Sequence, residues 1–282
     1  MNLQNILQEI EQQVDPELEE RMSSRRSALR DFAGLGGKIA LTALPFALGS
    51  FFNKSYGQTN NSSVLEILNY ALTLEYLEAE FYTTALTKTS ITFPTDAAKA
   101  AITKIKNDEA AHVAFLKTAI TTAGGTPITK PTFNFESNAT FGNVFANYVT
   151  FLAVAQAFED TGVRAYKGRA KELVKGGAYL TAALNIHSVE ARHASHIRQM
   201  RRTAAGGNQT AMKPWITGAN DSGVSAVNAV YAGEDNKVQA GVTITSLAGV
   251  NGTISANAAT EAFDEPLSKA DVLVIANLFI TA

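Results

Sequence analysis

The chain has 282 residues, of which 46% are hydrophobic and 18% charged, so it can bury a sizeable core and is not disordered over most of its length. Its net charge of -2, with only 24 Lys and Arg residues, excludes the basic surface that nucleic-acid binding requires. The absence of cysteine excludes disulfides, iron–sulfur clusters and thiolate sites, so any metal must be held by His, Asp and Glu.

Residues 1–55 are predicted to be an export signal followed by a linker. Arg25 and Arg26 precede a weakly apolar stretch at 32–52, and this order is typical of a signal peptide. The two arginines resemble a twin-arginine signal. Glycines and Pro45 interrupt the apolar stretch, which disfavours a membrane span of about 20 residues. We expect export to the periplasm or beyond the cell, with no stable span after processing; a Sec signal and an uncleaved anchor are the alternatives.

Residues 62–205 are predicted to form a bundle of four helices of similar length. Breaking residues divide this region into segments rich in Ala, Leu, Ile, Phe and Glu, and these breakers are Pro94, the turn at 124–127, Gly142 and the pair 176–177. Thr95 or Asp96 can cap the second helix. The glycines at 206–207 are expected to end the fourth helix.

Each predicted helix carries ionisable residues on the face that its three-and-four apolar spacing turns inward. The first and third helices each carry a glutamate seven residues before a tyrosine, and the second and fourth each carry a Glu-x-x-His motif. These inward-facing ionisable residues are Glu75, Glu109, His112, Glu159, Glu190 and His193. The repeated pattern indicates two similar helical hairpins whose polar residues meet at one level.

Four carboxylates in one dry layer are strongly destabilising unless something neutralises them. The inward faces carry no Lys or Arg, and two imidazoles cannot balance four carboxylates. Two divalent cations can balance the charge of the four carboxylates. One Glu from each of two helices plus Glu-x-x-His from each of the other two is the ligand set of di-iron and di-manganese carboxylate proteins. The sequence therefore predicts two divalent transition-metal ions at these six residues, with iron and manganese both open.

Three further residues are expected next to the ligands. Tyr82 and Tyr166 can hydrogen-bond ligand carboxylates, although a tyrosine at such spacing is also common in an ordinary core. His187 lies three residues before Glu190 and is expected to contact a ligand side chain without binding metal itself.

Three other ionisable residues are expected outside the site. Glu78 flanks the inward face of its helix and becomes a ligand only if the register differs by one position. Glu80 is expected to face water, and His196 is expected to lie at the surface or next to the ligands without binding metal.

Residues 206–282 form a C-terminal extension of different composition, rich in Gly, Asn, Thr, Ser and Val. The alternation across 238–254 predicts a short hairpin around Gly241 or Gly252. Pro266, Ser268 and Asp271 indicate the start of a fifth helix whose apolar residues can pack on the bundle. The extension is interpreted as a cover for the bundle, with a lid over the site or an oligomer contact as alternatives.

Two stretches, LEYLEAEFY at 74–82 and IHSVEARHA at 186–194, resemble the ferritin-like superfamily and, within it, the desiccation-related ferritin-like domain proteins exported by bacteria. The likeness covers 62–202 and extends weakly into the tail. It implies an all-α, ferritin-like four-helix bundle with the same six residues as metal ligands. A shared fold does not settle the chemistry.

We expect an exported di-metal carboxylate protein of ferroxidase or manganese-catalase type, which reacts with oxygen or peroxide in stress protection. Its expected partner is a small oxidant, no nucleic acid is expected, and an oligomer stays open. One alternative is a non-catalytic, desiccation-protective protein whose metals only staple the bundle. The other is iron storage, which a long extension would complicate in a closed cage.

Overall fold

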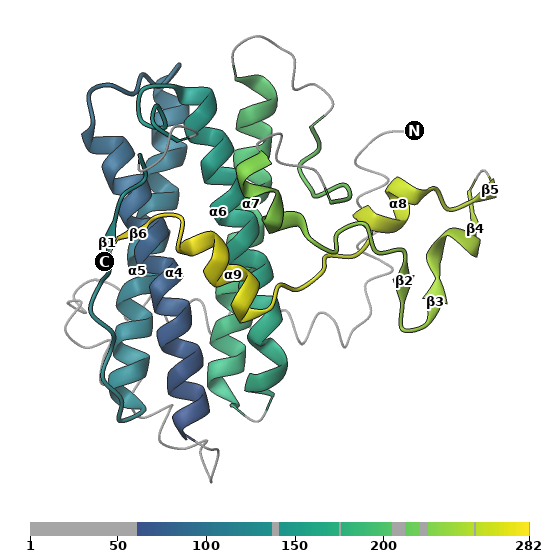
Figure 1. The fold of residues 1–282 in the computed structure, drawn as a ribbon, viewed down its shortest axis with the longest axis horizontal. Helices are drawn as coiled ribbons and strands as arrows, with labels where there is room; N and C mark the ends of the chain where they lie inside the picture. The colour runs from purple at the N-terminus through teal and green to yellow at the C-terminus, as the bar shows by residue number, and fades with distance from the viewer. Residues whose placement is uncertain are drawn as a thin grey trace, which may run out of the picture. The chain divides into compact units, whose positions relative to one another are not determined.

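The computed structural model describes residues 61–136, 141–174, 176–204, 212–219, 225–250 and 252–281. The predicted export signal, the linker and the glycine pair 206–207 lie outside these residues. Within the described chain, four long helices run side by side (Figure 1), namely α4 (Asn61–Thr87), α5 (Asp96–Thr122), α6 (Tyr148–Ala170) and α7 (Ala178–Thr203). The predicted all-α four-helix bundle is confirmed.

The helices begin where side chains can satisfy their first backbone N–H groups. The Thr95 hydroxyl accepts a hydrogen bond from Ala98 N, and the Asn147 side chain accepts one from Thr150 N, so polar residues cap α5 and α6. The pair α4 and α5 packs as one hairpin, and α6 with η1 (Lys171–Leu173) and α7 as another. This pairing agrees with the internal repeat seen in the sequence.

The core is densest around α6. Every residue of this helix from Phe151 to Tyr166 is buried, which indicates a helix covered on all sides. The fully buried Phe81 ring of α4 lies 5.2 Å from the Phe151 ring and 4.9 Å from the Phe158 ring, both on α6. Aromatic pairs at such distances stabilise the fold beyond the area they bury, and they hold α4 against α6.

The C-terminal extension completes the cover of α6. Helix α9 (Lys269–Ala276) begins at Ser268, whose hydroxyl accepts a hydrogen bond from Asp271 N, as the sequence predicted. The buried Phe279 ring after α9 packs 4.9 Å from that of Phe158. Strand β6 (Ile280–Thr281) then pairs antiparallel with β1 (Thr132–Phe133), which ties the chain end to the loop between the two helical hairpins.

The remaining elements of the extension are short. Two hairpins form where the sequence predicted one: β2 (Val238–Gln239) pairs with β3 (Val242–Thr243), and β4 (Ala248–Gly249) with β5 (Gly252–Thr253). The other elements are η2 (Ser225–Tyr231), η3 (Ile244–Ser246) and α8 (Ala256–Glu261). Among the described helices, none combines the length and the hydropathy that a membrane span requires.

Candidate metal centre

The six predicted ligands come together in the middle of the bundle. Glu75 lies on α4, Glu109 and His112 on α5, Glu159 on α6, and Glu190 and His193 on α7. The four glutamates are fully buried, His193 is buried, and His112 keeps a side-chain exposure of 12%. Four helices thus deliver six polar side chains to one interior level.

These residues form two overlapping groups, and within each group every residue offers one ligand atom that lies within 4.8 Å of those of the others. The first group is Glu75, Glu109, His112 and Glu190, and the second is Glu109, Glu159, Glu190 and His193. Both groups contain Glu109 and Glu190, so these two carboxylates lie between the groups. This is the arrangement in which two carboxylates can bridge two ions.

The two histidines mark the two groups. His112 Nδ1 lies 3.1 Å from oxygens of Glu75, Glu109 and Glu190. Burial by itself would lower the pKa of His112, but its hydrogen bonds to these glutamates outweigh burial and raise that pKa far above the ordinary value. The imidazole is therefore protonated near pH 7 and occupies the place where a cation is needed.

His193 is held from both sides. Its Nδ1 lies 2.8 Å from Glu109 Oε1 and 3.3 Å from Glu159 Oε2, while its Nε2 lies 3.1 Å from Asp108 Oδ2. Burial would lower its pKa, but the charge of Glu159 and the hydrogen bonds raise the pKa of His193 to about 11. Asp108 orients the ring so that Nδ1 faces the cluster, a role that carboxylates often play behind metal-ligating histidines. The sequence analysis did not identify Asp108, although it directly precedes Glu109.

Tyr82 and Tyr166 lie where the sequence predicted them, against the carboxylates. The Tyr82 hydroxyl donates to Glu159 Oε1, and the Tyr166 hydroxyl donates to Glu75 Oε1. Burial, and then the neighbouring glutamate charges, hold the pKa of both tyrosines well above the ordinary value. Both hydroxyls therefore stay protonated and fix one oxygen of each carboxylate.

Glu78 is a fifth buried carboxylate at this level. Only 3% of the residue is exposed, and burial followed by the charge of Glu190 raises its pKa well above the ordinary value. A Cβ at Gly162 would lie 3.2 Å from Glu78 Oε1 and 3.3 Å from Glu190 Oε2, so glycine leaves room for both carboxylates. The sequence analysis placed Glu78 at the flank of the inward face; the structure places it beside the cluster, because α4 is also covered by α6 and α9.

The donor atoms of the cluster are of the kinds that bind metal ions. Within the described chain, Glu109 Oε1, Glu159 Oε2, both Glu190 oxygens and His193 Nδ1 are buried, and the ion pairs described for them are with other members of the cluster. The described ion pairs of the four ligand-type glutamates are with histidines and not with Lys or Arg. Burial raises the pKa of Glu109 to about 7 and that of Glu190 well above the ordinary value. Buried carboxylates and imidazoles that have only one another as charged neighbours are suited to divalent transition metals.

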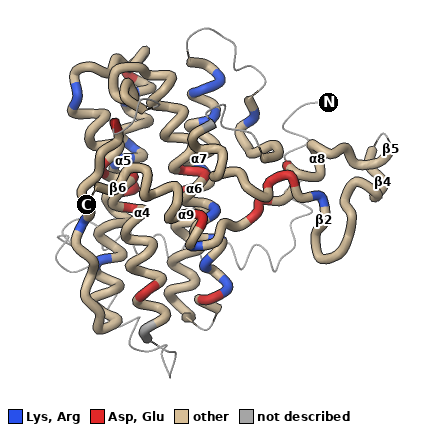
Figure 2. Tube along the Cα trace, in the orientation of Figure 1, with Lys and Arg blue, Asp and Glu red and all other residues tan. Residues whose placement is uncertain are grey.

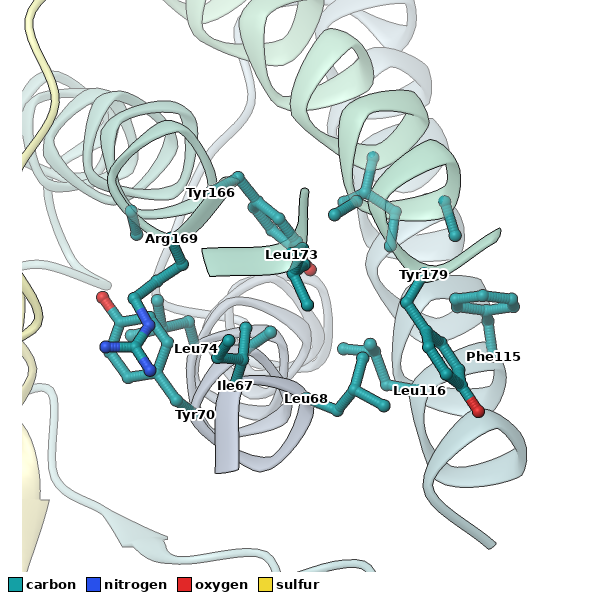
Figure 3. A pocket seen from close by; sticks show the side chains of 15 residues that line it. Ile67, Leu68, Tyr70, Leu74, Phe115, Leu116, Tyr166, Arg169, Leu173 and Tyr179 are labelled. Atoms are coloured by element: carbon teal, nitrogen blue, oxygen red, sulfur yellow. The ribbon is translucent and has the colours of Figure 1, made fainter. Parts of the chain in front are cut away.

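A small apolar cavity of about 20 Å³ lies next to Tyr166, at one end of the bundle interior (Figure 3). Leu68 and Leu116 line it together with Tyr179, and Arg169 stacks over the Tyr70 ring at its edge. A void of this size has room for one small molecule, and its apolar walls give water few partners.

The other histidines lie elsewhere. His187 lines a cavity between α6, α7 and the extension, and no described hydrogen bond joins it to a predicted ligand. His196 is exposed, as expected. Glu80 is partly exposed and pairs with Lys130 at 2.5 Å on the surface, so it lies outside the cluster.

Comparison with known proteins agrees with the fold. The family model described as a ferritin-like domain matches residues 63–203, which covers all four long helices almost completely and half of the chain. No curated protein matches the sequence. The chain, with its four-helix bundle and its buried glutamate and histidine cluster, belongs to the ferritin-like domain family.

Proposed function

We propose that this chain binds two divalent transition-metal ions, iron or manganese, at the glutamate and histidine cluster and uses them for redox chemistry with oxygen or peroxide. The observation that carries this proposal is the pair of overlapping ligand groups that share Glu109 and Glu190. Each group offers three carboxylates and one imidazole, which suits one ion per group with the shared carboxylates bridging. We further propose that the protein is exported and serves stress protection, in keeping with its resemblance to desiccation-related ferritin-like proteins.

Charge supports two ions over one. If all five buried glutamates, including Glu78, were ionised, two protonated imidazoles would leave a net negative charge in a region of low dielectric, which is why burial keeps protons on some of these carboxyl groups in the metal-free protein. One divalent ion that displaces the two imidazole protons would bring two positive charges and remove two, so the net charge of the cluster would not change. Two divalent ions bring four positive charges against the five carboxylates, and the remaining charge is small enough for protonation of one carboxylate to remove it.

The residues around the cluster support redox use. Bound iron or manganese would supply electrons to a small oxidant. Tyr82 and Tyr166 each hold one carboxylate oxygen through a donated hydrogen bond, which leaves the other oxygen of Glu159 and Glu75 for an ion. The apolar cavity beside Tyr166 has room for one small uncharged molecule next to the Glu75 side of the cluster.

The first experiment is elemental analysis of protein produced in iron- and manganese-supplemented media. Two transition-metal ions per chain are expected, because four carboxylates and two imidazoles share two ligand groups. A folded protein that holds no transition metal after gentle reconstitution would contradict the site.

The second experiment separates an enzyme from a metal-stapled structural protein. Oxygen uptake and peroxide decay are measured on the iron-loaded and manganese-loaded forms, with Glu159→Ala as the control. Turnover that depends on Glu159 supports the redox function. Metal that raises the melting temperature without any turnover would establish the structural alternative, and accumulation of many iron atoms per chain would point to storage.

A further inference from the structure

A second cavity, of about 270 Å³, lies between α6, α7 and the C-terminal extension. Its helical wall includes Val163 of α6 and Ala191 of α7, and its outer wall includes Trp215 and Phe263 of the extension. We call it the extension pocket. Its volume is near the lower end of the roughly 300–1,000 Å³ that is common for small-molecule sites, so it suits a molecule of one ring.

Two buried polar atoms of the extension pocket have no hydrogen-bond partner in the described chain: Glu234 Oε2 and His187 Nε2. Glu234 is only 1% exposed, and its other oxygen is occupied because it accepts from Glu265 N at 3.0 Å and lies 2.9 Å from Arg164 Nε. A buried polar atom without a partner destabilises the fold, because it has lost its hydrogen bonds to water. A ligand with hydrogen-bonding groups would remove this penalty at both atoms.

The charges of the extension pocket are already balanced. Each lining carboxylate has a basic partner among the described residues: Asp160 with Arg198, Glu234 with Arg164, Glu261 with Lys213 and Asp264 with Lys167. Figure 2 shows acidic positions of the extension beside α6 and α7. Burial lowers the pKa of His187, so its ring is neutral near pH 7. A charged ligand would therefore add a charge that nothing in the pocket offsets.

The walls between these polar groups are mainly apolar and partly aromatic. Trp215 and Phe263 keep exposed fractions of 50% and 40%, which is high for large aromatic residues beside a cavity. Ala191 and Ala194 of α7 present small side chains opposite them, so a flat ring has space between the helix and the extension. Aromatic side chains bind flat rings through offset or edge contacts.

We propose that the extension pocket binds a small neutral aromatic alcohol, a one-ring phenol, whose hydroxyl donates a hydrogen bond to Glu234 Oε2. The ring lies against the apolar walls near Trp215 and Phe263. A second oxygen substituent on the ring, when present, meets His187 Nε2. The pocket is separate from the metal cluster, since none of the six predicted ligands lines it, and the proposal does not depend on the redox function.

Trp215 makes the test direct, because it is the single tryptophan of the chain. The full-length protein is titrated with 4-fluorophenol and followed by tryptophan fluorescence and by ¹⁹F NMR of the ligand. Saturable binding in the millimolar range or tighter is expected. Benzoate, benzylamine and myo-inositol serve as anionic, cationic and non-aromatic probes and should bind at least roughly tenfold more weakly. Equal or tighter binding of any of these three would overturn the ligand class.

Variants locate the site. Ala191→Leu fills the pocket from an exposed position of α7 and should abolish binding, whereas Ala114→Leu, a matched exposed alanine on α5, should leave it unchanged. His187→Phe keeps a ring but removes Nε2, and should weaken binding of resorcinol more than that of 4-fluorophenol. Binding of 4-fluorophenol by Ala191→Leu at the wild-type affinity would overturn the proposal. The metal content of each variant is measured alongside, so failure here is distinguishable from failure of the metal site.

Discussion

Glu109 and Glu190 are the two residues of the cluster that belong to both ligand groups. Both Glu190 oxygens are buried, the described ion pairs of this carboxylate are with His112 and His193, and burial raises its pKa well above the ordinary value. A carboxylate in such a position destabilises the metal-free protein and is stabilised by a bound cation. Metal binding and folding stability are therefore expected to change together.

Glu190→Gln should remove metal binding while keeping the side-chain volume. Saturating metal stabilises a native state by about 2.7 kcal/mol at a concentration one hundred times Kd, and the variant should lose this increment. The metal-free variant should be at least as stable as the metal-free wild type, because a buried carboxyl group becomes a neutral amide. Thermal melts with and without metal measure both effects. Glu80→Gln is the control and should change stability by less than about 1 kcal/mol, since its Lys130 pair is exposed; loss of metal in this variant would show that the register of α4 is misassigned.

Metal binding should strengthen as pH rises. The pKa of His193 is raised to about 11, and that of His112 lies far above the ordinary value, so both rings are protonated near pH 7 in the metal-free protein. Their protonated forms stabilise the metal-free fold below the ordinary histidine pKa, and this contribution is lost only as pH rises through the raised values. An ion must displace these protons, so its apparent affinity should increase about tenfold per pH unit for each proton released. Calorimetric titration in buffers of different ionisation enthalpy counts the protons; an affinity equal at pH 6 and pH 8 would contradict the assignment.

At the scale of elements, α6 is the helix through which the bundle and the extension are joined. It is buried over 151–166, and the Arg164 backbone carbonyl accepts a hydrogen bond from Leu267 N at 3.2 Å. Gly168 lies at the closest approach, since a Cβ there would come within 2.0 Å of Leu267 O. The glycine is required because backbone, which cannot rotate away, occupies the space of a side chain.

Gly168→Ala should lower the free energy of unfolding by about 1–3 kcal/mol, because the segment that leads into α9 must move. Urea denaturation measures the change. Gly162→Ala on the same helix is the matched control: its Cβ meets only the ends of the Glu78 and Glu190 side chains, and alanine favours the helix by about 1 kcal/mol. Its metal-free stability should therefore not fall, although its metal affinity should. An equal loss of stability in both metal-free variants would show that helix geometry, and not contact with Leu267, decides the result.

At the scale of the whole molecule, export is the prediction that concerns where the chain works. Arg25 and Arg26 precede a weakly apolar segment, and a twin-arginine signal would carry the protein out already folded. Replacement of both by Lys should leave the precursor in the cytoplasm, because the receptor reads the arginine pair. Cell fractionation and immunoblotting measure the distribution. Export of the variant at the wild-type level would point to the Sec route.

The bundle could be predicted because its signals are local. Apolar residues at three-and-four spacing show which face of each helix is inward, and Thr95 and Ser268 show where two of the helices begin. The same spacing assigned six ionisable residues to the inward faces of the helices, and the structure brings these six together. Residues on the inward faces of neighbouring helices come into contact when they lie at the same level of the bundle. Two Glu-x-x-His motifs made this expectation specific.

Contacts between distant segments could not be read from spacing. Glu78 lies at the flank of the inward face of α4, and the small cavity that it lines is also lined by residues of α6 and of α9, which lies some 200 residues later in the chain. His187 looked like a neighbour of Glu190 by sequence, yet it lines the extension pocket. The periodicity of apolar residues shows on which face of its own helix a side chain lies. It does not show which distant segment of the chain packs against that face.

The sequence by itself determined the helices, their inward faces and the choice of residues that meet inside the bundle, because helix periodicity and capping act within a few residues. Only the tertiary structure decided that α6 is covered on every side, that Glu78 joins the buried carboxylates, and that the extension closes a pocket around His187 and Glu234. These features depend on how segments that are distant in the sequence pack against one another. Such contacts are set by shape and burial summed over the whole chain.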